Sequence, residues 1–463
     1  MTTTLEVRAP YDGALLDTMN VSTATEIEAA LELAYRLYRD RKAWIPKPER
    51  IAILRRAAGL TRARREELAL QVALESGKPL RDALIEVDRG IDGIELSAEC
   101  LRHEAGHVVP MDTNITSAGR VAFTQMEPIG VVLAISAFNH PFNLVIHQVA
   151  PAVAAGAPVI VKPSPKTPLS CRSIIEIFRE AGLLEGWAQM LLPLDLDVVQ
   201  TMVSDPRVAF LTFIGSASVG WKLRSHLAPG ARCALEHGGS APVIVAADAD
   251  LGQAVTRLGR AGFWHAGQAC VSVQRVFCDN SVLDDVVHGL SRVADTMITG
   301  DPSKIETEVG PLITHAEVAR VADWVSRSGA QVATGGKRLG DSTYSNTVLL
   351  NADPEADVSR LEVFGPVICV YGYDDIDSAL ARANSLPFSF QASVFTSHLD
   401  TAMKCYRHLD GTAIMVNEHP LFRVDWMPFA GARYSGLGTG GIPHTLREMQ
   451  VEKMLVWRSE ALN

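Results

Sequence analysis

Apolar positions divide the chain into a helical first part and an alternating remainder. In residues 23–41 and 48–76 the apolar residues recur at helical spacing, which predicts amphipathic helices up to the break GKP at 77–79. From residue 130 onward, short apolar runs rich in β-branched residues predict strands at 130–135, 158–161, 208–213 and 242–245. Helical stretches such as 144–155 and 169–181 separate several of these runs. Strands that alternate with helices in this way predict parallel βαβ units with right-handed crossovers.

A second set of α/β elements begins near Gln274. Its members are predicted helices at 282–297 and 376–383 and predicted strands at 367–371 and 413–416. A stretch rich in glycine and proline at 428–443 then interrupts regular structure. The last alternating segment, 452–457, predicts an isolated strand whose free edge pairs elsewhere, for example with another subunit.

Length, charge and cysteine usage limit the class of protein. A chain of 463 residues predicts two or three domains, and its 47% hydrophobic and 21% charged residues are typical of a globular protein. The net charge of −10 and the lack of a dense Lys/Arg block argue against nucleic acid or a membrane surface as partner. No apolar run reaches the ~18 residues of a membrane span, and the first residues lack a signal-peptide pattern. The seven cysteines are scattered without a C-x-x-C pair, so we expect a reduced, cytoplasmic protein with no disulfide framework and no metal site.

Three residues are candidates for nucleophilic catalysis. Cys270 ends the segment FWHAGQAC, Glu236 opens the glycine-rich turn EHGGS, and Asn139 lies in the sequence FNHP. A thiol, a carboxylate and an amide donor can act together as nucleophile, general base and oxyanion stabiliser. An isolated cysteine is more often a small buried hydrophobic residue, so the interpretation of Cys270 depends on its surroundings.

Three turns are candidates for a cofactor site, and each has a plainer alternative. The sequence FIGS follows a strand and leads into a helix at 219–227, so Gly215 and Ser216 could bind a phosphate at the helix N-terminus. The fingerprint G-x-G-x-x-G is absent, and an ordinary helix cap explains the same residues. Lys162 of VKPSP could reach ribose hydroxyls from a strand end, or be a surface lysine. Glu362 of EVFGP could equally be exposed in a plain turn.

The order of these motifs is more specific than any one of them. FNHP, VKPSP, FIGS, EHGG, GQAC, EVFGP and MPFAGARYSGLG occur in the order and approximate spacing of the aldehyde dehydrogenase superfamily. The chain resembles this family from PYDG near its start, through ESGKP at 75–79, to EKMLV at 452–456.

The resemblance implies an α/β fold with three parts. These are a Rossmann-like cofactor domain (1–105 and 129–236), an α/β catalytic domain (237–442) and a small β oligomerisation extension (106–128 and 443–463). The extension of family members pairs subunits, so the resemblance also implies a homodimer or homotetramer.

The activity implied by the resemblance is NAD(P)-dependent oxidation of an aldehyde to its carboxylic acid. The Cys270 thiolate would attack the carbonyl, with the Asn139 amide and the Cys270 backbone N–H holding the oxyanion of the thiohemiacetal. Hydride loss would leave a thioester, which water activated by Glu236 would hydrolyse. Because a free thiol has a pKa of ~8.5, we expect a base or local field to raise the ionised fraction of Cys270.

The resemblance also implies a set of cofactor contacts from the strand ends and the EVFGP turn. They are Ile135, Phe138, Lys162, Ser164, Gly215, Ser216, Val219, Glu362 and Phe364, with Lys162 counted in the catalytic set as well. Many NAD-preferring members have a glutamate three residues after the lysine, where this chain has Pro165. Without that carboxylate a 2′-phosphate is not repelled, so the choice between NAD and NADP stays open. Pro193-Leu194 replaces the usual Pro-Gly, and Phe138 replaces a common tryptophan.

The substrate prediction rests on FNHP together with FRVDW at 422–426. Both are similar to the branch that acts on small polar aldehydes, including lactaldehyde and phosphonoacetaldehyde. His140 and Arg423, with Phe422 beside them, could bind a hydroxylated or anionic tail, the arginine through a bidentate fork. A salt bridge with Asp425 is an equal alternative for Arg423. Ala269 adds no charge before the nucleophile, which weighs against a phosphonate.

Two other functions are compatible with the resemblance. An acylating relative would resolve the thioester with coenzyme A, but such relatives commonly lack the glutamate found here as Glu236. A catalytically silent structural relative would keep only the fold. The joint presence of Cys270, Glu236, Asn139, Lys162 and Glu362 argues against the silent alternative.

Overall fold

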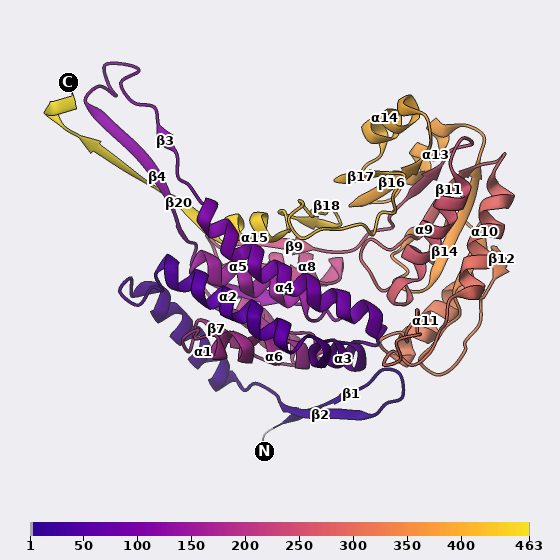
Figure 1. Ribbon diagram of the computed structural model, residues 1–463, viewed down its shortest axis with the longest axis horizontal. Helices are drawn as coiled ribbons and strands as arrows, with labels where there is room; N and C mark the ends of the chain where they lie inside the picture. The colour runs from indigo at the N-terminus through magenta and orange to yellow at the C-terminus, as the bar shows by residue number, and fades with distance from the viewer. Residues whose placement is uncertain (1–2, 463) are drawn as a thin grey trace.

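The computed structural model describes residues 3–462, in which two mostly parallel sheets lie in separate helix-covered bodies and a long antiparallel arm projects from the first body (Figure 1). The first sheet has the order β19-β9-β8-β5-β6-β7. Its strands are β5 (Val131–Ile135), β6 (Val159–Lys162), β7 (Ala188–Met190), β8 (Val208–Ile214), β9 (Arg232–Glu236) and β19 (Gly436–Leu437). All neighbours are parallel except β19 and β9. The predicted parallel βαβ units are therefore confirmed.

Helices cover both faces of this sheet. The side chains of β5 are all buried, and they alternate between two hydrophobic cores. One core includes the helices α2 (Lys47–Ala63), α4 (Leu80–His103), α5 (Asn143–Ala155) and α6 (Pro168–Glu180). The other includes α1 (Ala24–Arg39), α7 (Leu196–Ser204) and α8 (Ala217–Arg224). Burial on both faces explains why these strands are continuously apolar in sequence.

The predicted helical stretch 48–76 is two helices in the structure. Arg64, with φ −109° and ψ 15°, leaves the helical conformation between α2 and α3 (Arg65–Ser76). Glu66 and Glu67 lie in the first turn of α3, where negative charge favours a helix N-terminus. No proline or glycine lies at this break. The helical spacing of apolar residues continues across it, which is why the sequence predicts one helical stretch.

The second sheet has the order β12-β13-β14-β11-β10-β16-β17. Its strands are β10 (Val243–Val245), β11 (Arg275–Asp279), β12 (Gln331–Thr334), β13 (Thr347–Leu350), β14 (Val367–Tyr373), β16 (Gln391–Phe395) and β17 (Ala413–Val416). Its helices include α9 (Leu251–Phe263), α10 (Leu283–Thr296), α11 (His315–Ser326), α13 (Ile376–Ala383) and α14 (Leu399–His408). The helices predicted at 282–297 and 376–383 and the strands predicted at 367–371 and 413–416 are all confirmed.

The last strand is not isolated. β20 (Gln450–Arg458) pairs antiparallel along its whole length with β4 (Arg120–Pro128), which also pairs with β3 (Val108–Val109). Most backbone groups on one edge of β20 are satisfied within the same chain, which corrects the prediction of an isolated strand. The other edge of β20 remains open, and its side chains from Val451 to Arg458 are exposed.

Two further features complete the architecture. A hairpin of β1 (Thr4–Arg8) and β2 (Leu15–Asn20) lies beneath the first body in the view of Figure 1. Among the helices that the structure describes, none combines the length and apolar character required to cross a bilayer.

Candidate active site

The carboxyl ends of four parallel strands meet at one edge of the first sheet. In the strand registers Ile135 lies beside Lys162 and Phe213, and Ile214 lies beside Glu236. The Gly215 N–H donates to the Glu236 carbonyl at 3.1 Å, which ties the FIGS turn to the start of the EHGG turn. In doubly wound sheets this edge is where ligands bind. The candidate cofactor residues and the candidate base therefore share one edge.

The loop between β5 and α5 carries Phe138, Asn139 and His140. Its end is held by Glu86, whose Oε1 accepts the backbone N–H groups of Phe142 and Asn143 at 2.9 and 3.0 Å. These donors belong to the first turn of α5, which has no other side-chain cap. Glu86 thus fixes the end of this loop.

A strained turn precedes Cys270. His265, Ala266 and Gly267 have φ values of 49°, 54° and 72°, a left-handed region that residues with a Cβ rarely adopt. A Cβ on Gly267 would lie 2.0 Å from the Gly365 carbonyl oxygen, so glycine alone fits against the EVFGP loop. Strain of this kind costs of order 1–3 kcal/mol per residue and persists only where the surroundings impose it.

The three candidate catalytic residues converge on this turn. The Asn139 amide nitrogen donates to the Gln268 carbonyl at 2.9 Å, two residues before Cys270. The Gly239 N–H donates to the Cys270 carbonyl at 3.2 Å, which brings the EHGG turn to the cysteine. Cys270 is partly buried and packs against a small apolar cluster that includes Phe390 and Phe429.

Burial controls the ionisation of Cys270 and Glu236. It raises the pKa of Cys270 to about 12, the charge of Arg423 opposes this rise, and the carboxyls of Glu362 and Glu236 add to it. Burial likewise raises the pKa of Glu236, with Arg423 opposing. The prediction that the surroundings raise the ionised fraction of Cys270 is therefore wrong, because the effect of burial on its pKa outweighs the effect of the Arg423 charge.

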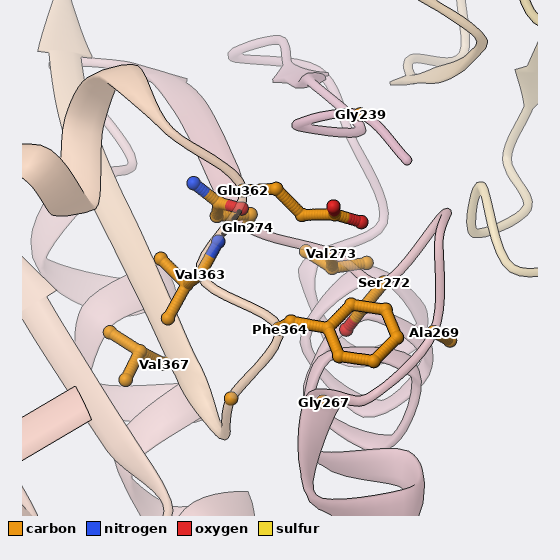
Figure 2. Close-up of a pocket in the computed structure, with 11 residues that line it drawn as sticks. Gly239, Gly267, Ala269, Ser272, Val273, Gln274, Glu362, Val363, Phe364 and Val367 are labelled. Carbon is orange, nitrogen blue, oxygen red and sulfur yellow. Dashed lines mark hydrogen bonds between the residues drawn. The ribbon is translucent and has the colours of Figure 1, made fainter. Parts of the chain in front are cut away.

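Glu362 lies over the EHGG turn. A Cβ on Gly238 would lie 1.7 Å from Glu362 Oε1, so a larger residue there would displace the Glu362 carboxyl. Glu362 Oε1 is buried and has no hydrogen-bond partner among the described residues, and burial raises the pKa of the Glu362 carboxyl to about 8. The alternative of an exposed turn glutamate is thereby removed. Figure 2 shows Glu362 and Phe364 over the small pocket beside Gly239, Gly267 and Ala269.

Three other candidate cofactor residues, Lys162, Ser164 and Ser216, have polar groups that can form further hydrogen bonds. Lys162 Nζ is partly buried and donates only to the Pro163 carbonyl at 3.2 Å, and burial lowers its pKa. Ser216 is the N-cap of α8 but makes no capping bond, and Val219 on the same helix is 39% exposed. Ser164 Oγ accepts the Lys166 N–H at 3.2 Å.

The aromatic residues of this set also meet. The rings of Phe138 and Phe364 are edge to face, with their centroids 5.8 Å apart. Among the described residues, the unpartnered Oε1 of Glu362, the Lys162 amine and the uncapped N-terminus of α8 fit a dinucleotide with ribose hydroxyls and phosphates.

Among the residues that the structure describes, no carboxylate pairs with Arg423. Asp425 instead pairs with Arg89 at 2.6 Å and with His147 at 2.7 Å, so the salt bridge weighed for Arg423 does not form. Arg423 lies 3.6 Å from the ring centroid of Phe429, one guanidinium nitrogen is 3.4 Å from His147 Nδ1, and its Nε is buried without a partner. Phe422 is 42% exposed and is not part of these contacts.

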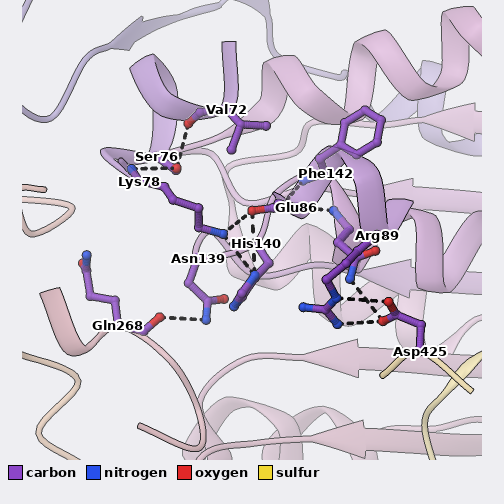
Figure 3. Close-up of polar contacts among 11 residues, drawn as sticks. Val72, Ser76, Lys78, Glu86, Arg89, Asn139, His140, Phe142, Gln268 and Asp425 are labelled. Atoms are coloured by element: carbon purple, nitrogen blue, oxygen red, sulfur yellow. Dashed lines mark hydrogen bonds and ion pairs between the residues drawn. The ribbon is translucent and has the colours of Figure 1, made fainter. Parts of the chain in front are cut away.

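His140 lies in a buried polar cluster. Its Nδ1 is 3.0 Å from Lys78 Nζ, and its ring stacks on Trp264 with centroids 5.2 Å apart. Lys78 forms an ion pair with Glu86, and the two side chains are 0% and 2% exposed (Figure 3). The sequence singled out Lys78 only as part of the ESGKP motif.

Gln268 braces the turn that precedes Cys270. Its Nε2 donates to the carbonyls of His265 and Pro311 at 3.1 and 3.2 Å, and its Oε1 accepts the Ile313 N–H at 2.9 Å. Only the GQAC motif pointed to this glutamine, and the spacing alone assigns it no role. In residues 3–462 no group of three His, Cys, Asp or Glu residues is arranged to hold a metal ion.

Comparison with known proteins identifies the class of this site. Residues 1–455 match the model of the aldehyde dehydrogenase family. The chain is 36% identical to a 3-sulfolactaldehyde dehydrogenase of Priestia aryabhattai over 88% of this chain and 86% of that protein. It is 32% identical to a lactaldehyde dehydrogenase of Methanocaldococcus jannaschii over 98% and 97% of the two chains.

A solved structure agrees. The glyceraldehyde-3-phosphate dehydrogenase of Methanocaldococcus jannaschii, complexed with NADP, superposes with a TM-score of 0.94 at 30% identity, over 99% of this chain and 100% of that chain. The chain belongs to the aldehyde dehydrogenase family. It is an oxidoreductase with the aldehyde dehydrogenase fold.

Proposed function

We propose that this protein oxidises a small aldehyde with a polar or anionic tail to its carboxylic acid, through a covalent intermediate on Cys270 and with NAD or NADP as hydride acceptor. The observation that carries this proposal is the convergence of Cys270, Glu236 and Asn139 at the sheet edge where β6 ends in Lys162 and where Glu362 approaches Gly238. A cysteine, a glutamate and an asparagine are residue types that act as nucleophile, base and oxyanion donor, and a lysine and a glutamate can bind a cofactor.

The first step is attack by the Cys270 sulfur on the aldehyde carbon. Since burial keeps the thiol protonated at neutral pH, its proton must pass to a base as the S–C bond forms. Glu236 is the carboxylate available for this transfer, directly or through a water. The carbonyl oxygen becomes an oxyanion, which the Asn139 Nδ2 and the Cys270 N–H stabilise once Nδ2 exchanges the Gln268 carbonyl for this stronger acceptor.

The second half of the reaction releases the acid. When bound, the nicotinamide dinucleotide supplies the acceptor for the hydride that leaves the former aldehyde carbon, and the acyl group then remains on Cys270 as a thioester. Glu236 first releases the proton of the thiol to solvent. It then takes a proton from water as the water attacks this carbon, and returns that proton to the Cys270 sulfur as the sulfur leaves. Glu236 Oε1 lies against Gly440, where an added Cβ would be 2.1 Å from it. This assignment of Glu236 favours hydrolysis over transfer to coenzyme A.

The cofactor contacts follow from the available polar groups. Lys162 and Glu362 would bind ribose hydroxyls, and Gly215, Ser216 and the α8 N-terminus would hold a phosphate. Ile135, Phe138, Ser164, Val219 and Phe364 would line the same crevice. Pro165 leaves no carboxylate beside Lys162 to repel a 2′-phosphate, so we infer that NADP is accepted, as in the archaeal relative complexed with NADP.

The substrate class follows from Arg423 and from the relatives. Arg423 is the cation without a carboxylate partner beside Cys270, so an anionic or hydroxylated tail is its natural ligand. The aldehydes that name the three relatives are lactaldehyde, sulfolactaldehyde and glyceraldehyde 3-phosphate, and each carries a hydroxyl beside the carbonyl carbon. His140 is the second substrate contact.

The remaining organisation is proposed from the same family resemblance. Residues 1–105 and 129–236 form the cofactor domain, 237–442 the catalytic domain, and 106–128 with 443–463 the oligomerisation extension. The open edge of β20 would join subunits into a homodimer or homotetramer, in the cytoplasm.

The test is an aldehyde panel run with NAD and NADP in parallel. We expect acid and reduced cofactor in equal amounts, higher kcat/KM for short polar or anionic aldehydes, and measurable turnover with NADP. Preference for long apolar aldehydes would contradict the substrate class, and an acyl-CoA product would favour the acylating alternative. No reduced cofactor with any aldehyde, together with no selective labelling of Cys270, would favour a silent structural relative.

A further inference from the structure

Lys78 and Glu86 are buried behind His140, and the reaction outlined above does not use them. The Lys78 ammonium pairs with the Glu86 carboxylate, lies 3.0 Å from His140 Nδ1, and is 5.1 Å from the ring centroid of Trp264. Figure 3 shows the Lys78 amine between Glu86 and His140. A buried ion pair costs free energy to desolvate and adds little net stability to the fold. Stability alone therefore does not account for Lys78 and Glu86.

The charges of this pair follow from its hydrogen bonds. Glu86 receives donors only, from the backbone N–H groups of Phe142 and Asn143 and from Lys78. A carboxylate has acceptors only and matches this set, at a helix N-terminus that favours negative charge. Burial lowers the pKa of Lys78 and the charge of Glu86 opposes this change, so the buried anion is balanced by the Lys78 ammonium.

These charges determine the tautomer of His140. An ammonium group has three donors and no acceptor, so His140 Nδ1 must accept its hydrogen bond. Burial lowers the pKa of His140 well below its usual value, and the charges of Lys78, Arg89 and Arg423 lower it further. The ring is therefore neutral, and its one proton is on Nε2.

The Nε2–H group lies at the edge of the ring that points away from the buried ion pair. The Nδ1 edge faces the buried pair, while 15% of the His140 side chain is exposed, so the accessible edge is the opposite one. Nε2 has no hydrogen-bond partner recorded within residues 3–462. His140 follows Asn139, whose amide donates to the Gln268 carbonyl two residues before Cys270, so the ring lies close to the turn that carries the reacting sulfur.

We propose that Lys78 and Glu86 are positioning residues that hold His140 as a neutral Nε2–H donor, and that this donor selects aldehydes with a hydrogen-bond-accepting oxygen on the carbon next to the carbonyl. The inference rests on the proposed oxidation at Cys270. It narrows the substrate class from polar aldehydes to 2-hydroxy- and 2-oxoaldehydes, with or without an anionic group further along the chain.

The kinetic test uses three aldehydes of equal length: propanal, 2-hydroxypropanal and 2-oxopropanal. His140→Phe is expected to lower kcat/KM for both oxygenated substrates by about 10–100-fold more than for propanal, because the donor is lost. His140→Gln can place an amide N–H near the position of Nε2 and should keep most of the preference. Equal losses on all three aldehydes would overturn the proposed selection.

Lys78→Met separates the tautomer from the presence of the ring. Without the ammonium, the nearest partner of His140 Nδ1 is the Glu86 carboxylate, which is 3.7 Å away. The proton should then move to Nδ1, and Nε2 should become an acceptor. A 2-hydroxyl can still donate to it, but a 2-oxo group cannot. We expect a selective loss of about tenfold or more on 2-oxopropanal, and loss of both substrates in parallel would contradict the tautomer assignment.

A spectroscopic measurement on the wild type tests the tautomer of His140 without depending on turnover or on the folding of Lys78→Met. Nitrogen-15 NMR of histidine-labelled wild-type enzyme, with His140 assigned by its disappearance in His140→Gln, should show the neutral Nε2-protonated form. A cationic or Nδ1-protonated ring would overturn the role of Lys78 and Glu86. Failure of the wild type to oxidise any aldehyde would instead refute the proposed function, and with it the substrate selection, whatever tautomer is found.

Discussion

At the scale of single residues, Arg423 is the charge that most affects the reacting groups. It opposes the effect of burial on both Cys270 and Glu236, and it has no carboxylate of its own. An anionic substrate tail bound to Arg423 would cancel part of this charge. Binding of such a tail would therefore weaken the effect of the guanidinium on the pKa of Cys270.

The pKa of Cys270 makes a direct prediction for labelling. Because burial raises that pKa to about 12, the ionised fraction is below that of a free thiol at every pH under about 12 and rises tenfold for each pH unit. The rate of Cys270 alkylation by iodoacetamide in cofactor-free enzyme should therefore climb from pH 7 to pH 10 without a plateau. Arg423→Gln should slow it further, since the one opposing cation is gone. A plateau below pH 8 would contradict the assigned environment.

Glu236→Gln separates acylation from hydrolysis. Gln cannot accept a proton, so water is not activated, and we expect steady-state turnover to fall by about 10²–10⁴-fold. Acylation can still occur slowly with solvent as the base, so stopped-flow absorbance should show a burst of reduced cofactor of about one per site. Full steady-state turnover would refute the role of Glu236, and a matched Glu185→Gln on an exposed turn should behave as wild type.

The sequence predicted the candidate reacting residues but not the contacts that support them. Cys270, Glu236 and Asn139 lie in turn motifs whose order is readable along the chain. The contacts of Arg89, His147 and Asp425 join α4, α5 and the loop before Phe429, and they depend on packing that no local pattern encodes. A salt bridge between Arg423 and Asp425 was compatible with their closeness in sequence, but Asp425 pairs with Arg89 instead.

At the scale of elements, the turn from His265 to Gly267 is the strained part of the site. Its shape depends on Gly267, because an added Cβ would meet the Gly365 carbonyl at 2.0 Å. Gln268 then fixes the turn to Pro311 and Ile313. The position of the Cys270 sulfur is set by this turn rather than by a regular helix or strand.

Gly267→Ala should therefore cost both stability and activity. Gly230 is a matched control, because its φ is +88° but nothing lies within 4 Å of an added Cβ. Both substitutions force alanine into the left-handed region, at about 1–2 kcal/mol. Only Gly267→Ala adds the clash, so it should lower the free energy of unfolding by at least about 1–3 kcal/mol more than Gly230→Ala, and lower kcat as well. Equal urea midpoints for the two variants would contradict this account.

Element prediction succeeded where a local pattern decides the structure. The helix at 376–383 and the strand at 413–416 have the predicted bounds, since amphipathic spacing and a short apolar run suffice there. It failed at Arg64, where a helix ends without proline or glycine, and at β20, whose partner β4 is more than 300 residues away. Pairing between distant segments is a property of the packed chain.

At the scale of the whole molecule, the arm of β3, β4 and β20 is the natural place for subunit contacts. Leu455 and Trp457 on β20 are 50% and 67% exposed, next to the open strand edge. A long edge strand with exposed apolar residues is expected to be covered by another chain.

Leu455→Lys tests this contact. A charge in the middle of the edge should shift the species seen by light scattering from a dimer or tetramer toward the single chain, with little change in secondary structure by circular dichroism. Leu339→Lys is a control of equal exposure, 51%, away from the arm, and it should leave the assembly unchanged. A single-chain species in the wild type would contradict the proposed oligomer.

The proposed reaction requires that the acyl group is bound to the Cys270 sulfur as a thioester before water releases it. Glu236→Gln mixed with NADP and 2-hydroxypropanal, quenched in acid within the burst and digested, should yield the peptide that contains Cys270 with the mass of the 2-hydroxypropanoyl group added, in an amount equal to the reduced cofactor formed. Reduced cofactor without any acylated cysteine, or with the acyl group on another of the seven cysteines, would contradict the account.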